Sequence, residues 1–169
     1  MSYIDVLPLA TMKTYLRIDD TQNETDAEIT SMINAAFRYI ENATNIMVYD
    51  RNKEYIITNR CVWIYDYPIN SVVKGIDDDD VDVTLTYKTN YNKDPRHLYT
   101  YFYSIDGDAI KLVLNVGYAD PADVPDDIVG LAKEIVKAMY FEQETDKTFH
   151  EMLSPTSMTI LNLNRRFII

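Results

Sequence analysis

Five aspartates between residues 77 and 82 form the densest group of possible metal ligands in the sequence. Asp77, Asp78, Asp79 and Asp80 are consecutive, and Asp82 follows after one valine. Carboxylate oxygens bind Ca²⁺ and Mg²⁺, but a loop that wraps a cation intersperses its ligands with glycine and other polar residues. This run lacks that spacing. We therefore expect a solvated acidic loop without a metal, and we keep a small acidic metal-dependent enzyme as an alternative.

The other reactive side chains do not have the spacing of a catalytic or cofactor site. His97 and His150 lie far apart, with no HExxH or CxxC motif near either. Cys61 is the only cysteine and lies in the apolar run CVWIY, which excludes an internal disulfide and indicates a buried thiol. The serines occupy no GxSxG-like turn, and the glycines form no phosphate-binding loop. The sequence therefore predicts no catalytic residues, no cofactor and no enzymatic activity.

Composition and charge exclude further classes of function. The chain has 169 residues, 47% hydrophobic and 25% charged, as expected for a globular protein. Its 16 basic and 27 acidic residues give a formal net charge of -11, which repels phosphate and argues against sequence-specific nucleic-acid binding. No stretch approaches the roughly 20 apolar residues of a membrane span, and the N-terminus lacks a secretion signal. We expect a soluble protein made in the cytoplasm.

Three segments carry apolar residues at helical spacing. Pro8 precedes the first helix, near residues 9–18. Thr25 and Glu28 have the spacing of a capping box at the start of the second, at 26–44. Pro125 opens the third, at 125–143, which is apolar on more than one side. A helix of this kind must bury more than one face.

The segment between the second and third helices has the composition of a sheet. Residues 54–65 are rich in aromatic and β-branched side chains, and Pro68 marks a bend. Residues 81–88 and 110–117 alternate apolar and polar positions, which predicts two half-buried antiparallel strands.

Tyrosines mark one face of a further predicted strand. Tyr99, Tyr101 and Tyr103 alternate along the chain, and Asp106-Gly107 then supplies a turn. A nucleic-acid stacking surface would come with a basic groove, which this acidic chain lacks. The tyrosine face therefore favours a core or a protein interface.

These elements predict an α+β fold that is mainly α. We expect a helical bundle, with helices near 9–18, 26–44 and 125–143, an inserted antiparallel β element at about 54–118 and an extended C-terminal arm. Residues 1–150 should form a single domain. Residues 151–169 carry no clear helical stripe and no acid after Glu151, which indicates the arm.

Three segments together resemble the phage head-tail connector, or adaptor, proteins. LATMKTYLRIDD and DAEITSMINAAFRYIENATN are similar to the two opening helices of that family. YDYPINSVVKGI is similar to its strand after a proline, and LVLNVGYADPADVPDDIVGLAKEIVKAMYFEQE to its strand, glycine-tyrosine turn and final helix. The resemblance runs from about residue 9 to 145. Residues 86–109 and the stretch after Glu144 are longer than is usual in the family.

The resemblance implies a structural virion protein of the neck. Such a subunit forms a homo-oligomeric ring, dodecameric by resemblance, that docks on the portal protein, extends the DNA channel and meets a distal tail or neck protein. DNA would pass without sequence-specific binding, and no membrane is involved. A tail-completion or terminator ring subunit is the alternative within the virion. Assembly would take place in the host cytoplasm.

Two sets of residues are predicted to make the contacts of that subunit. A cyclic ring needs two different adhesive surfaces on each copy, which would explain the second apolar side of the last helix. The predicted inter-subunit residues are Val129, Val136, Tyr140 and Phe141. The predicted portal-binding arm combines apolar side chains with two arginines: Leu161, Leu163, Arg165, Arg166, Phe167, Ile168 and Ile169.

Overall fold

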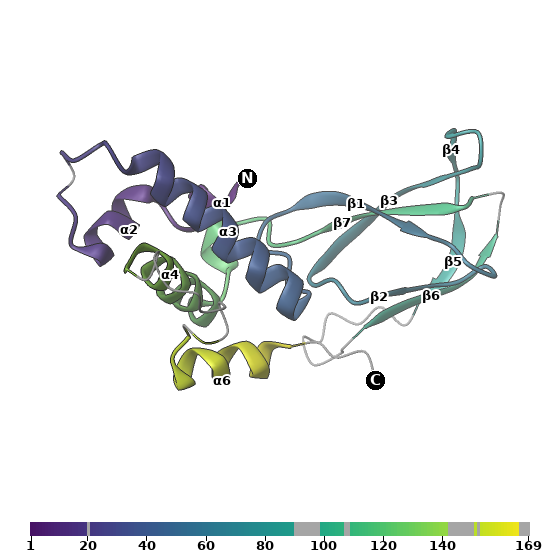
Figure 1. Cartoon of the computed structure of the whole chain (residues 1–169). Helices are drawn as coiled ribbons and strands as arrows, with labels where there is room; N and C mark the ends of the chain where they lie inside the picture. The colour runs from purple at the N-terminus through teal and green to yellow at the C-terminus, as the bar shows by residue number, and fades with distance from the viewer. Residues whose placement is uncertain (20, 90–98, 107–108, 142–150, 152, 166–169) are drawn as a thin grey trace. The chain divides into compact units, whose positions relative to one another are not determined.

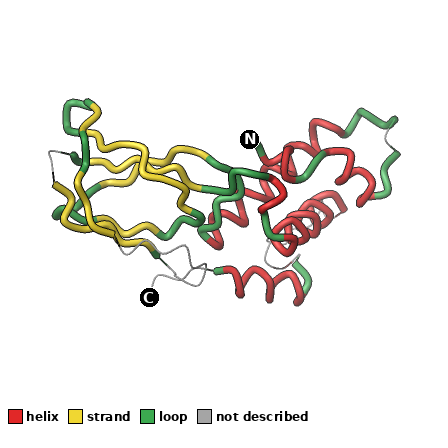
Figure 2. Tube along the Cα trace, turned by 180° about the vertical axis from the view of Figure 1, so that it is seen from behind, coloured by secondary structure: helices red, strands yellow, loops and turns green. Residues whose placement is uncertain are grey.

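The described residues form two compact units, one helical and one made of β-strands (Figures 1 and 2). The helical unit contains Met1–Tyr49 and Tyr118–Arg165, and the β unit contains Asp50–Gly117. This mixed architecture confirms the predicted α+β fold, with the β element inserted between the second and third predicted helices. The computed structural model describes residues 1–19, 21–89, 99–106, 109–141, 151 and 153–165.

The helical unit confirms the three predicted helices as α2, α3 and α4 (Figure 1). Residues 142 and 143, expected at the end of the third, lie outside the described residues. None of the helices in the described part of the chain is long and apolar enough to span a membrane. In chain order the helical elements are α1 (Tyr3–Val6), α2 (Leu9–Leu16), α3 (Asp26–Thr44), the 3-10 helix η1 (Pro121–Asp123), α4 (Asp126–Phe141) and α6 (Pro155–Asn164).

The core of the helical unit lies between α3 and α4. Ile33 and Phe37 of α3 are fully buried. In α4, Ile135 is fully buried and Leu131 is 1% exposed. Burying each such side chain contributes about 1.5–3 kcal/mol to the stability of the fold. The 3.6-residue period of the sequence therefore predicted this packing correctly.

The start of α3 differs from the predicted capping box. Thr25 is the residue before the helix, but its φ of -98° and ψ of 0° are not extended, and its side chain makes no capping hydrogen bond. A buried lysine organises the region instead. Lys13 Nζ lies 3.0 Å from Asp26 Oδ1 and donates a hydrogen bond of 2.7 Å to the backbone oxygen of Gln22.

Residues 155–164 of the predicted extended arm form a helix, α6. Ser154 caps α6 by accepting a hydrogen bond of 3.1 Å from the backbone N–H of Ser157, and Pro155 occupies the first turn. Leu161 is fully buried in the core of the helical unit. With Leu161 and Ser157 as its buried positions, α6 has no periodic apolar stripe, and the sequence pattern did not reveal it.

The β unit contains two antiparallel sheets. The first has four strands in the order β1-β7-β3-β4, and the second has three in the order β2-β6-β5. Side chains that include Ile64, Phe102, Leu112 and Leu114 are buried within the unit. The strands are β1 (Arg51–Ile56), β2 (Val62–Ile64), β3 (Ile69–Ile76), β4 (Asp82–Val83), β5 (Thr86–Thr89), β6 (Thr100–Asp106) and β7 (Lys111–Val116).

One predicted strand is divided between the two sheets. Residues 81–88 were expected to form a single half-buried strand, but β4 pairs with β3 and β5 pairs with β6. Thr84 and Leu85 carry the chain from one sheet to the other. Alternation gives no sign of such a crossing, because the period of 2 continues through it.

Candidate functional site

The outer face of the three-stranded sheet carries a row of stacked aromatic rings. Trp63 of β2 lies opposite Tyr101 of β6, and their ring centroids are 4.2 Å apart at 28° between planes. Tyr103 stacks on the other side of Tyr101 at 5.5 Å and 14°. Tyr99 packs against Trp63 at 4.8 Å. We call Trp63, Tyr99, Tyr101 and Tyr103 the aromatic row.

Strand alternation explains why these rings point outward. Val62 and Ile64 of β2 are buried, as is Phe102 of β6, so the residues between them lie on the opposite face. Trp63 is 48% exposed, Tyr99 39% and Tyr103 38%. The sequence predicted the shared tyrosine face, and the Tyr101–Tyr103 stack confirms it. Trp63 was missed because cross-strand register is not visible in the sequence.

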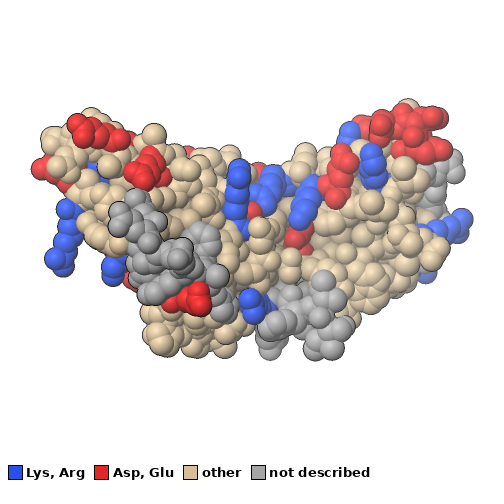
Figure 3. Space-filling model, viewed as in Figure 1, with Lys and Arg blue, Asp and Glu red and all other residues tan. Residues whose placement is uncertain are grey.

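A tight turn leads into β2 beside the aromatic row. Asn59 and Arg60 both have positive φ, 53° and 61°, in the turn that pairs Thr58 with Cys61. Cys61 is half-buried, not buried as predicted. Its hydrogen bond with Tyr101 raises the pKa of that phenol above its ordinary value. Figure 3 shows a mainly uncharged surface over β2 and β6.

Exposed rings in this arrangement suit a protein interface. Tyrosine and tryptophan combine a large apolar body with a hydrogen-bond donor, and they are enriched where proteins meet. Stacking within the aromatic row fixes the side chains before any partner arrives, which lowers the entropy lost on binding.

The acidic run forms the turn before β4, and the carboxylates of Asp77 and Asp80 have protein partners. Asp77 Oδ1 accepts hydrogen bonds from the backbone N–H groups of Asp79 and Val81, at 3.0 and 2.8 Å. Asp80 lies 2.9 Å from Lys111 Nζ. Within the part of the chain that the structure describes, no group of three acidic, histidine or cysteine residues could hold a metal ion. His97 and His150 lie outside the described residues.

The four predicted inter-subunit residues of the last helix lie in different environments. Val136 is fully buried within the subunit, so it cannot contact a neighbour without unfolding. Val129 and Tyr140 are half-buried against the helical core, and Phe141 is 64% exposed. Tyr140 and Phe141 pack edge to face at 5.2 Å. Phe141 is therefore the residue of the four that most fully faces away from the core.

The predicted portal-binding arm is also divided. Leu161 belongs to the core of the helical unit, whereas Leu163 is 80% exposed on α6. Asn164 Nδ2 donates to Asp127 Oδ2 at 2.9 Å, which ties the end of α6 to the first turn of α4. Arg165 is half-buried. Arg166, Phe167, Ile168 and Ile169 lie outside the described residues.

A family model decides the identity of the chain. The model described as phage gp6-like head-tail connector protein matches residues 7–94, just over half of the 169 residues. The chain belongs to this family. It is a structural connector protein, as the motifs in its sequence predicted. A search of curated proteins found no match.

Solved structures share the fold of this connector protein. A chain from the "Neck of empty GTA particle computed with C6 symmetry" aligns with a TM-score of 0.75 and 16% identity. Chains from the "Virion of native gene transfer agent (GTA) particle" and the "Neck of native GTA particle computed with C12 symmetry" align with TM-scores of 0.72 and 0.70, at 17% and 16% identity. Each alignment covers 97% of this chain and 91% of the other.

Proposed function

We propose that this connector protein is one subunit of a closed ring in the neck of a tailed particle. The ring docks on the portal protein, extends the DNA channel and joins the capsid to the tail. The observation that carries the proposal is the match to the head-tail connector family, supported by a shared fold with chains from particle necks. The C6 and C12 symmetries applied to those necks support a closed ring, to which we assign twelve copies. The same match favours a connector over a tail-terminator subunit.

A closed ring requires two different surfaces on each subunit, because every copy meets its neighbours through unlike faces. The β unit offers the aromatic row. The helical unit offers the exposed side chains Phe141 and Leu163, with Val129 and Tyr140 beside the core. In this proposal, neighbouring copies bind these two surfaces, and the portal binds the C-terminal residues from Arg165 to Ile169. Another face of the ring meets a distal neck or tail protein.

Charge supports a passive role toward DNA. A subunit of net charge -11 repels phosphate, so the ring lets DNA pass without binding it in a sequence-specific manner. The same acidity reduces non-specific adhesion between free subunits before the ring closes. No catalytic step is part of this function, and the protein acts in the virion.

The proposal is tested by measuring how single-residue variants assemble on the cognate portal. Phe141→Asp and Trp63→Ser should leave circular dichroism unchanged and lower ring occupancy on the portal, since both side chains are exposed. Ile56→Asp is the matched control, because Ile56 is 76% exposed on β1 and lies outside both surfaces. If both test variants occupy the portal as fully as this control does, the assigned contacts are wrong.

A further inference from the structure

One edge of the four-stranded sheet is open along most of its length. β3 pairs with β7 between Ile69 and Ile76, with register shifts at Asn70 and Val73, but β4 pairs with its other side only at Gly75 and Ile76. Within the described part of the chain, no strand pairs with residues 71–74 on that side. An open edge presents backbone N–H and C=O groups that can hydrogen-bond to another strand.

The crossing of the chain between the two sheets creates this opening. After Val83 the chain leaves β3 and enters β5, which pairs with β6. Leu85 packs over Gly75 at the crossing point, where its side-chain carbons lie 2.7 Å from the position that a Cβ on Gly75 would occupy. Any larger residue at Gly75 would displace Leu85. The contact between Leu85 and Gly75 therefore helps to fix the point at which the chain leaves β3 for β5.

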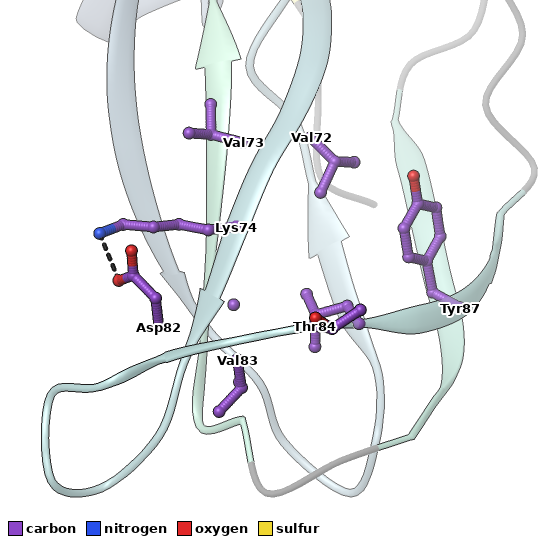
Figure 4. A pocket seen from close by; sticks show the side chains of 9 residues that line it. Val72, Val73, Lys74, Asp82, Val83, Thr84 and Tyr87 are labelled. Carbon is purple, nitrogen blue, oxygen red and sulfur yellow. Dashed lines mark hydrogen bonds and ion pairs between the residues drawn. The ribbon is translucent and has the colours of Figure 1, made fainter.

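A groove of about 410 Å³ lies along the open edge. Val72, Val83, Leu85 and Tyr87 supply much of its apolar wall. Figure 4 shows Val72 and Tyr87 on one side of the groove, and Lys74 paired with Asp82 on the other. Val73 on the open edge is 45% exposed. The groove thus joins an unpaired backbone edge to pockets for apolar side chains.

The surroundings of the groove are strongly acidic. Asp82 is paired with Lys74 at 2.5 Å, and Asp80 with Lys111 at 2.9 Å. Within the described residues Asp78 and Asp79 make no ion pair. Figure 3 shows a patch of acidic side chains beside β4. The charge that complements this corner is positive.

We propose that the open edge of β3 binds an extended basic segment of another virion protein, which adds as a strand and places alternate apolar side chains in the groove. Backbone hydrogen bonds supply affinity in this mode of recognition, and the pockets supply specificity. The arginines or lysines of the segment face Asp78, Asp79 and Asp82. This binding goes beyond the connector function and does not depend on ring formation, so it can be measured on the purified chain.

The test uses a short peptide that alternates arginine and valine, titrated into the full chain by nuclear magnetic resonance and calorimetry. The expected result is saturable binding that shifts the backbone amides of Val72 and Val73 most. The same peptide with N-methylated backbone amides should not bind, because it cannot form the strand ladder. A glutamate-valine peptide should not bind either. Equal binding of the N-methylated peptide, or no binding of the arginine peptide, contradicts the proposal.

Charge variants of the protein test whether the aspartates beside the groove attract the basic peptide. Asp78→Lys and Asp82→Lys should each weaken the peptide about three- to fivefold, as expected for exposed charge pairs. Asp123→Lys makes the same change in net charge on exposed η1 of the helical unit and should leave the affinity unchanged. Equal weakening by all three variants would mean that only net charge matters. If the Val72 and Val73 amides shift when the protein is concentrated without peptide, the occupant is a second copy and the proposed partner is wrong.

Discussion

The phenol of Tyr3 donates a hydrogen bond of 2.7 Å to Oε2 of Glu41, joining the first turn of the chain to the end of α3. Oε1 of the same carboxylate accepts the backbone N–H of Val48 at 2.9 Å. Tyr3 also stacks on Phe37, with ring centroids 5.3 Å apart. Glu41 is 4% exposed, so its carboxyl oxygens depend on these donors for hydrogen bonds in place of water. One carboxylate thus holds α1, α3 and the segment that leads into the β unit.

Replacing Tyr3 by phenylalanine tests this contact, because the ring stack is kept and the donor is lost. Tyr3→Phe should lower the free energy of unfolding by about 1–3 kcal/mol, the cost of leaving a buried acceptor without its donor. Urea unfolding followed by far-ultraviolet circular dichroism measures the change. Tyr15→Phe is the control, since Tyr15 also donates to a carboxylate, that of Glu134, but at an exposed position. Equal losses in the two variants would show that burial does not strengthen the Tyr3 contact.

The Tyr15–Glu134 contact makes a prediction about pH. The hydrogen bond to Glu134 raises the pKa of Tyr15 from 10.0 to about 12. The folded-state pKa is the higher one, so the contact stabilises fully below about pH 10 and is lost as the pH rises through about 12. An ultraviolet titration of wild type minus Tyr15→Phe should show one phenol titrating near pH 12. In Glu134→Gln that phenol should return toward its ordinary range; a wild-type step already near 10 would refute the assignment.

Two leucines of α6 test whether the C-terminal segment belongs to the folded subunit. Leu161 is fully buried and Leu163 is 80% exposed, although they are two residues apart. Leu161→Ala should lower the free energy of unfolding by about 2–5 kcal/mol. Leu163→Ala should change it by less than about 0.5 kcal/mol. If thermal and urea unfolding give equal effects, α6 does not pack as described.

The acidic turn should not act as a metal site. Asp77 and Asp80 already bind backbone N–H groups and Lys111, and the ligand spacing does not wrap a cation. Calorimetry with Ca²⁺ and Mg²⁺ should show no binding tighter than about millimolar. One saturable site of micromolar affinity would overturn this prediction, and Asp78→Asn would then identify it.

Helix positions could be predicted from the sequence because burial repeats every third or fourth residue along one continuous segment. The apolar side chains Ile29, Ile33 and Ile40 of α3 follow that rule and are fully buried. α6 escaped prediction because one leucine, Leu161, carries its deepest contact. Its other buried position, Ser157, is polar, so the two together make no apolar period.

Contacts between distant segments could not be predicted in the same way. The pairing of Trp63 with Tyr101, and the open edge beside Val73, depend on strand order and register. Alternation records which residues share a face but not which strand lies next to them. Val136 shows a second limit of the sequence. Its apolar side chain predicted burial, but the sequence could not tell burial in the subunit core from burial against a neighbouring copy.

The most direct test of the connector function is the number of copies that assemble on the portal. Native mass spectrometry and electron microscopy of the purified chain, alone and mixed with its cognate portal, measure that number. The proposed function predicts a closed ring of twelve copies bound to one face of the portal. A chain that leaves the portal bare, or that binds it as isolated copies without closing a ring, would contradict it.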